Sequence, residues 1–255
     1  MNTQEQKNAG ATAVSSDVKN LLEAGVHFGH RAERWNPKFE KFIYGKRNGI
    51  HIIDIRQTVE LLKLAADAVA SILETGGDAI FVGTKQQARD ILMEEAEKSG
   101  SHYVVDRWVG GLLTNFSNIS RRIQRYAELD SLAASDQFKQ LPAKEQVRLM
   151  RLHRKMSKLY KGVKAMDSLP AMMFVIDPVK ETTAVAEARR LKIPVIGLID
   201  TNGDPELVDF PIPGNDEAMR SIKLVTNVVC EAVMRSKKAF EADLDEDSEE
   251  KERER

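Results

Sequence analysis

The sequence predicts an α/β protein with a parallel sheet that has helices on both faces, from which an antiparallel helical hairpin projects. Short apolar runs such as Ala79–Val82 and Val195–Ile199 alternate with helical patterns, and strands of that kind are typical of a sheet covered on both sides. The segment Asn115–Asp167 has no strand signal but contains two helical patterns that separate near Pro142. These patterns favour a hairpin of two helices inserted between strands.

Length and charge indicate one folded domain with two tails. The chain has 255 residues, of which 42% are hydrophobic, and a formal net charge of −1. Residues 241–255 hold nine acids and three bases, so this segment carries −6 and the remainder of the chain carries +5. We expect a flexible arm over residues 1–16, a single α/β domain over 17–240 with the hairpin inserted at about 115–167, and an acidic disordered tail over 241–255.

Three features bear on the location of the protein in the cell. Met1–Ser16 is polar and lacks the apolar core of a signal peptide. No apolar run approaches the roughly 18 residues that a membrane span requires. The single cysteine, Cys230, lies in the apolar run Leu224–Val233 and is expected to be a buried thiol. These features predict a cytoplasmic protein.

The N-terminal part of the domain is expected to contain three small elements. The Asn-Gly pair at 48–49 is a strong hairpin-turn signal. Gly29 and Pro37 interrupt the stretch before it and favour a loop. The elements are a short helix capped by Ser16 or Asp17 that ends at Gly25, a loop over Val26–Lys38, and a hairpin of Phe42–Tyr44 with Ile50–Ile53.

Strands and helices then alternate along the chain. The expected strands are Ala79–Val82, Tyr103–Val105, Met172–Ile176 and Val195–Ile199. The expected helices run from Thr58 to Gly76, from Lys85 to about Lys98, from Lys180 to Leu191, and from Asn215 or Asp216 to about Lys237. The parallel strands should be joined by right-handed crossovers.

The second arm of the hairpin is strongly basic. Lys144–Lys164 contains eight Lys or Arg residues and a single acid, Glu145, a pattern that suits either nucleic-acid phosphates or an anionic membrane surface. Its apolar residues have helical spacing and are expected to pack on the first arm: Leu149, Leu152, Met156, Leu159, Val163 and Met166 against Ile119, Ile123, Tyr126 and Leu129. Because that apolar face is occupied, the membrane alternative is disfavoured.

An enzyme is the main alternative class. Polar residues follow several of the expected strands, where ligands bind in open α/β sheets: Gly83-Thr84-Lys85, Asp177-Pro178, Asp200–Asp204 and Gly214-Asn215. However, no phosphate-binding P-loop or Gly-x-Gly-x-x-Gly motif is present, and Asp and Asn are also the residues that turns and helix caps need. His27 and His30 lack a nearby cysteine to complete a zinc set. No catalytic residue, metal or cofactor is therefore expected.

Several stretches taken together resemble one family, the S-two protein of the bacterial small ribosomal subunit. They are Leu22-Glu-Ala-Gly-Val-His-Phe-Gly-His30, Trp35-Asn-Pro37, Arg47-Asn-Gly-Ile-His-Ile-Ile-Asp54, Phe81-Val-Gly-Thr-Lys85, Arg107-Trp-Val-Gly-Gly-Leu-Leu-Thr-Asn-Phe116 and Pro211-Ile-Pro-Gly-Asn-Asp216. They occur in order over roughly Val18–Lys237. The chain departs from the family at Ala171, where an acid is usual, and at Lys161-Gly162, where a Gly-Gly pair is usual.

The resemblance implies a structural ribosomal protein rather than an enzyme. The family has a flavodoxin-like domain with an inserted helical hairpin. It contacts ribosomal RNA of both head and body at the neck of the small subunit, and it joins late in assembly. It also helps to recruit the large protein S-one, which binds messenger RNA. The implied partners are therefore small-subunit ribosomal RNA and other small-subunit proteins including S-one, with no membrane and no small-molecule substrate.

If RNA is the partner, Lys and Arg contacts to phosphates should supply most of the affinity, with release of bound counterions. Trp35 and Trp108 are expected to pack inside the protein rather than stack on bases. The candidate RNA-binding residues are Arg31, Arg34, Lys46 and Arg47 on the loops, and Arg151, Arg154, Lys155 and Lys158 on the hairpin.

Overall fold

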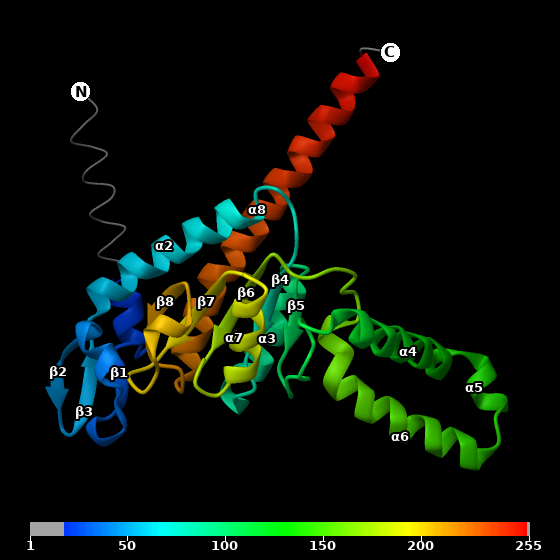
Figure 1. Ribbon diagram of the computed structural model, residues 1–255, viewed down its shortest axis with the longest axis horizontal. Helices are drawn as coiled ribbons and strands as arrows, with labels where there is room; N and C mark the ends of the chain where they lie inside the picture. The colour runs from blue at the N-terminus through cyan, green and yellow to red at the C-terminus, as the bar shows by residue number, and fades with distance from the viewer. Residues whose placement is uncertain (1–17, 254–255) are drawn as a thin grey trace.

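A five-stranded parallel sheet forms the centre of the protein (Figure 1). The computed structural model describes residues 18–253, with side chains described through residue 242, so the expected arm over residues 1–16 lies outside the described residues. The strands are β4 (Ala79–Val82), β5 (His102–Val104), β6 (Met172–Ile176), β7 (Val195–Ile199) and β8 (Phe210–Pro213). Their order is β5-β4-β6-β7-β8, and every neighbouring pair is parallel. The predicted flavodoxin-like α/β class is confirmed.

The last strand, β8, was not among the strands expected from the sequence. Pro211 and Pro213 lie within it, and a proline cannot donate a hydrogen bond to a neighbouring strand, so it argues against a central strand. The structure resolves the conflict by placing β8 at the edge of the sheet, paired only with β7 among the described strands.

Alternate side chains of each strand point to opposite faces of the sheet, so the sheet has two cores. Phe81 and Phe174 pack on one face beneath three helices, α2 (Ile55–Leu73), α3 (Gln86–Lys98) and α8 (Met219–Arg253). The opposite face is covered by α7 (Thr182–Arg190) and the root of the hairpin. The predicted burial on both faces is therefore observed.

A small antiparallel sheet lies beside the carboxyl end of the large one (Figure 1). It contains β1 (Phe28–Arg31), β2 (Ile43–Arg47) and β3 (Ile50–Ile53) in the order β1-β3-β2. Asn48 and Gly49 form the predicted turn with φ values of 51° and 79°. The expected loop over Val26–Lys38 was wrong in part, because β1 and two 3-10 helices, η1 (Ala32–Arg34) and the start of η2 (Pro37–Phe42), occupy it.

Thr201 joins the two sheets. The backbone N–H of His30 in β1 donates to the Thr201 hydroxyl at 2.9 Å, and the backbone N–H of Asn36 donates to the Thr201 carbonyl at 2.8 Å. Gly29 leaves the space for this contact, since a Cβ atom there would lie 2.5 Å from Thr201 Cγ2. The small sheet is thus held against the strand ends by a residue that lies two positions after the end of β7.

The predicted hairpin projects from the body as two long helices, α4 (Phe116–Ala134) and α6 (Ala143–Tyr160), with the short α5 (Asp136–Gln140) between them (Figure 1). Four residues of α4 are buried as expected: Ile119, Ile123, Tyr126 and Leu129. Leu152 of α6 does not join the apolar contact and is 40% exposed. His153 takes its place against Tyr126, because Asp130 lies 2.7 Å from its Nε2 atom and satisfies the ring.

The last helix differs from expectation at both ends. It begins at Met219, because the Asn215 side chain accepts hydrogen bonds from the backbone N–H groups of Glu217 and Ala218 and forms a turn before the helix. At the other end α8 continues through the acidic segment to Arg253, so the helix does not stop at the expected boundary near residue 240. The expected division into domain and tail stays a prediction.

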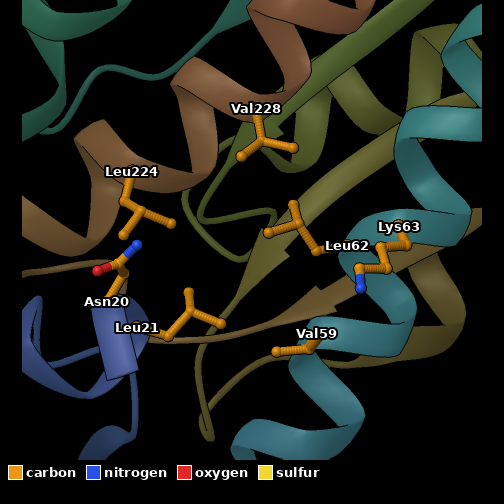
Figure 2. Close-up of a pocket in the computed structure, with 7 residues that line it drawn as sticks. All are labelled: Asn20, Leu21, Val59, Leu62, Lys63, Leu224 and Val228. Atoms are coloured by element: carbon orange, nitrogen blue, oxygen red, sulfur yellow. The ribbon is translucent and has the colours of Figure 1, made fainter. Parts of the chain in front are cut away.

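Figure 2 shows a shallow apolar groove between the short helix at residues 18–23, α2 and α8. Its lining is Asn20 and Leu21 from the short helix, Val59, Leu62 and Lys63 from α2, and Leu224 and Val228 from α8. Lys63 is the only residue in this lining with an ionisable side chain. The groove therefore lacks the paired acid and base that a catalytic site requires.

Candidate functional site

The eight candidate RNA-binding residues form two groups at opposite ends of the protein (Figure 1). All are exposed, and none forms an ion pair or a side-chain hydrogen bond with another residue of the described part of the chain. Their charges are therefore available to a partner. Arg31, Arg34, Lys46 and Arg47 lie on and beside the small sheet, whereas Arg151, Arg154, Lys155 and Lys158 lie on α6.

The four residues on α6 share one face of the helix. Their separations of three, four and seven residues correspond to one and two helical turns, so the side chains follow one another along a stripe. Arg148 continues the stripe three residues earlier and is exposed. On α4, the exposed pair Arg121 and Arg122 adds further positive charge. These three residues were not among the predicted candidates, although Arg148 follows the same helical spacing as the four that were.

The strand register brings two of the other candidates near each other. Arg31 of β1 and Arg47 of β2 are both paired with Ile50 of the central strand β3, which places their backbones about 10 Å apart across the sheet. Lys46 precedes Arg47, and Arg34 ends the 3-10 helix after β1. Trp35 packs on His51 with ring centroids 5.2 Å apart, which is consistent with its expected role in packing.

A polar cluster lies at the carboxyl ends of the parallel strands. Lys85 follows β4, and its Nζ atom lies 2.7 Å from Asp177 Oδ2 and 2.7 Å from Asp216 Oδ1. Burial lowers the pKa of Lys85, but the two carboxylates together raise it above its ordinary value. Burial, together with the charges of Asp200 and Asp177, raises the pKa of Asp216 to about 7. One ammonium group is thus shared by two buried acids, Asp177 and Asp216.

His30 extends this cluster toward the small sheet. Its Nδ1 atom lies 3.0 Å from Asp200 Oδ2, within ion-pair distance but without the alignment of a hydrogen bond. The interaction with Asp200 raises the pKa of His30. In the described part of the chain, His30, Asp200 and Asp216 offer ligand atoms within 4.8 Å of one another and could hold a metal ion. These positions are far apart in the sequence, so spacing rules could not group them. The expected absence of a metal stays a prediction.

The other strand-end groups are used internally rather than exposed to a substrate. The Thr84 hydroxyl and backbone N–H both donate to Glu181 Oε1, at 2.5 and 2.9 Å. Asn215 caps the turn before α8. The expectation that Asp and Asn at the strand ends serve turns and helix caps is consistent with the geometry of Asn215.

Glu187 organises the loop that leads into the hairpin. It lies on α7, is 8% exposed, and accepts five hydrogen bonds. Its Oε1 atom accepts from the Trp108 indole at 3.0 Å and from the Gly111 N–H at 2.7 Å. Its Oε2 atom accepts from the Leu113 N–H and from the N–H and hydroxyl of Thr114, each at 3.1 Å. Burial alone would raise the pKa of Glu187, but these donors lower it overall.

The arrangement of these charged groups defines a class of protein. At the strand ends Lys85 is paired with two buried acids, while basic residues without partners among the described residues lie on projecting elements. None of the helices in the described residues has the length and apolar character needed to cross a membrane. This is the organisation of a structural binding protein rather than an enzyme.

Comparison with known proteins agrees with this class. The chain matches the Ribosomal protein S2 family over residues 21–236. The small ribosomal subunit protein uS2 of Coprothermobacter proteolyticus is 51% identical over 217 residues, which cover 85% of this chain and 81% of the relative. The uS2 proteins of Endomicrobium trichonymphae and Thermus thermophilus are both 50% identical over 86% and 88% of this chain, and over 90% and 88% of their own lengths.

The chain therefore belongs to the ribosomal protein S2 family. It is a structural, non-enzymatic constituent of the small ribosomal subunit and takes part in translation. The resemblance carried by the sequence motifs is confirmed.

Lys85→Met should destabilise the fold, because it leaves Asp177 and Asp216 buried without their positive partner. We expect the free energy of unfolding to fall by about 3–5 kcal/mol, as when one partner of a buried ion pair is removed. Urea titration followed by circular dichroism measures it. Lys155→Met, at an exposed and unpaired position, is the matched control and should change stability by less than about 0.5 kcal/mol. Equal values for the two variants would contradict a role for Lys85 in charge compensation.

Glu187→Gln should make stability less dependent on acid pH. The folded-state pKa of Glu187 is below its ordinary value of 4.5, so its contribution is fully present above pH 4.5 and is lost as the pH falls through the folded-state pKa. We expect the variant to be less stable than the parent protein by about 2 kcal/mol at neutral pH, with the difference shrinking in acid.

Urea titrations between pH 7 and the lowest pH at which the protein stays folded would measure this difference. Glu60→Gln removes an exposed carboxylate from α2 and is the control, with a small difference at every pH. A Glu187→Gln difference that stays constant down to low pH would show that the carboxylate charge contributes nothing.

Proposed function

We propose that the chain binds ribosomal RNA of the small subunit through its two groups of basic residues. The observation that carries this proposal is the set of eight exposed Lys and Arg side chains without partners among the described residues. Unpaired cations on projecting elements release counterions when they meet phosphates, and that release is favourable. Structured RNA is recognised largely through its shape and backbone, which suits a stripe of cations on a rigid helix.

The separation of the two groups supports a position at the neck of the subunit. The small sheet and α6 lie at opposite ends of the body (Figure 1). Two separated cationic surfaces can hold two RNA segments at once, as contact with both head and body requires. The cytoplasmic location expected from the sequence is part of the same proposal.

Removal of charge from α6 should weaken binding and reduce its salt dependence. The test variant carries Arg151→Gln, Arg154→Gln, Lys155→Gln and Lys158→Gln, and its target is small subunits prepared without this protein. The slope of log affinity against log salt should become shallower by about 0.7–0.9 for each residue that contacts a phosphate. Cosedimentation over a series of salt concentrations measures both quantities.

A control variant with the same change of charge separates local contact from net charge. Arg190→Gln, Arg220→Gln, Lys223→Gln and Lys238→Gln alter exposed residues on α7 and α8 and should leave the slope nearly unchanged. The equivalent variant of the small sheet, with Arg31, Arg34, Lys46 and Arg47 changed to Gln, tests the second surface. Slopes equal to that of the parent protein in both test variants would rule out phosphate binding by these residues.

We further propose that the small sheet contributes to recruitment of protein S-one. Phe28 and Tyr44 are exposed by 48% and 71%, and exposed aromatic side chains are typical anchors of protein interfaces. Phe28 and Gly45, the neighbour of Tyr44, are both paired with Ile52 of β3, so the two aromatic residues come from adjoining parts of one small sheet.

Tyr44→Ser should therefore reduce the amount of S-one retained on small subunits. Loss of an aromatic anchor at an interface costs more than about 1 kcal/mol, so retention at limiting S-one should fall at least about fivefold. Quantitative immunoblotting of sedimented subunits measures it. Leu64→Ser, which changes another exposed apolar residue on α2, is the control. Equal retention for both variants would place the S-one contact elsewhere.

A further inference from the structure

The hairpin is connected to the body by two chain segments, one leading in and one leading out. The entrance is the loop at residues 107–115, which ends where α4 begins at Phe116. The exit is η3 (Lys161–Val163), which lies against the edge strand β5. The direction in which the basic stripe of α6 points therefore depends on how firmly these two segments are held.

The exit is held by close packing. A Cβ atom at Gly162 would lie 2.2 Å from the Tyr103 carbonyl oxygen, so the backbone of η3 rests directly on β5. Beyond η3, Lys164 Nζ lies 2.6 Å from Asp130 of α4, which also lies 2.7 Å from His153 of α6. These contacts join the two arms to each other and to the sheet edge.

The entrance packs into the core through Trp108, Leu112 and Leu113, and its polar groups converge on one side chain, Glu187. Both oxygens of Glu187 accept hydrogen bonds, and the donors span the loop from Trp108 to Thr114, two residues before α4. Glu187 itself is well supported, because Ala184, Val185 and Ala188 of α7 are buried against the sheet. The carboxylate is thus a fixed point of the body to which the loop is attached.

We infer that Glu187 is a positioning residue for RNA binding: it fixes the entrance loop and so sets the direction of the basic hairpin. This inference rests on the proposed function. Glutamine at position 187 has the same shape as glutamate, but one of the two accepting oxygens is replaced by an NH2 group. That group cannot accept hydrogen bonds from the loop donors that it faces, so the bonds to one of the two oxygens are lost. The exit contacts and the helices remain, and the hairpin samples a wider range of directions.

This role has a signature that differs from loss of a phosphate contact. If only a fraction of hairpin directions can bind, the apparent Kd rises in inverse proportion to that fraction. The bound complex keeps all its phosphate contacts, so the slope of log affinity against log salt is unchanged. Removal of the basic residues themselves lowers the affinity and the slope together.

The experiment compares the parent protein, Glu187→Gln and Trp108→Phe, with Glu60→Gln as the control. Binding to small subunits prepared without this protein is measured over a salt series. In parallel, spin labels at Gln124→Cys on α4 and Gln87→Cys on α3, both at exposed positions, report the distance distribution between hairpin and body. Native Cys230 is buried and stays unlabelled. Trp108→Phe removes one of the five bonds, so it tests the inference even if Glu187→Gln folds poorly.

We expect Glu187→Gln to broaden the distance distribution and to weaken binding about five- to tenfold, with an unchanged salt slope; Trp108→Phe should show the same changes to a smaller degree. An unchanged distance distribution, or a slope that falls with affinity, overturns the inference alone. If the variant with four glutamines on α6 binds with the parent affinity and slope, the proposed function fails for the hairpin and the inference fails with it.

Discussion

The ion pairs of the Lys85 ammonium group with Asp177 and Asp216 are the interaction on which the rest of the structure depends. Three parts meet there: the carboxyl ends of the parallel strands, the small sheet and the start of α8. Parallel strands bring their carboxyl ends to one edge of the sheet, so Asp177 and Asp216 are buried close together there. Without a positive partner, these acids would repel one another in a medium that screens charge poorly. The same edge receives the small sheet through His30 and the start of α8 through Asn215. Charge compensation by Lys85 therefore allows the strand ends, the small sheet and the start of α8 to pack together.

That closed edge also explains how an enzyme-like fold serves a structural role. In open α/β sheets, the carboxyl edge is where ligands usually bind. Here Glu181 receives the donors of Thr84, and Lys85 is held between two acids. The exposed basic residues that are available to partners lie instead on the hairpin and on the small sheet, at the two ends of the protein (Figure 1). Membership of the S2 family and the geometry of the chain thus give the same account of the protein.

Local patterns predicted most of the fold. The apolar runs of the central strands, the Asn48-Gly49 turn and the helical spacing of the hairpin are short-range signals, and the structure confirms each of them. The misses have non-local causes. Prolines obscured β8, which is stable only as an edge partner of β7. Leu152 was expected to pack on α4 because it is apolar, but His153 packs there instead, with its ring nitrogen next to Asp130. The hydrogen bonds of Glu187 to the loop at residues 107–115 could not be predicted, because contacts between residues far apart in the sequence produce no periodic pattern.

The length of the hairpin determines how much its base can rotate before its tip is displaced by a large distance. The 18 residues of α6 span about 27 Å at 1.5 Å per residue. A rotation of only 10° at the base therefore moves the tip by about 5 Å, close to a full helical turn. Phosphate groups are separated by similar distances along a nucleic-acid strand. If α6 binds RNA as proposed, a small angular error would shift its cations from one phosphate toward the next. A long hairpin whose cations must align with the phosphates of an RNA backbone therefore has to be rigid at its attachment to the body as well as along its helices.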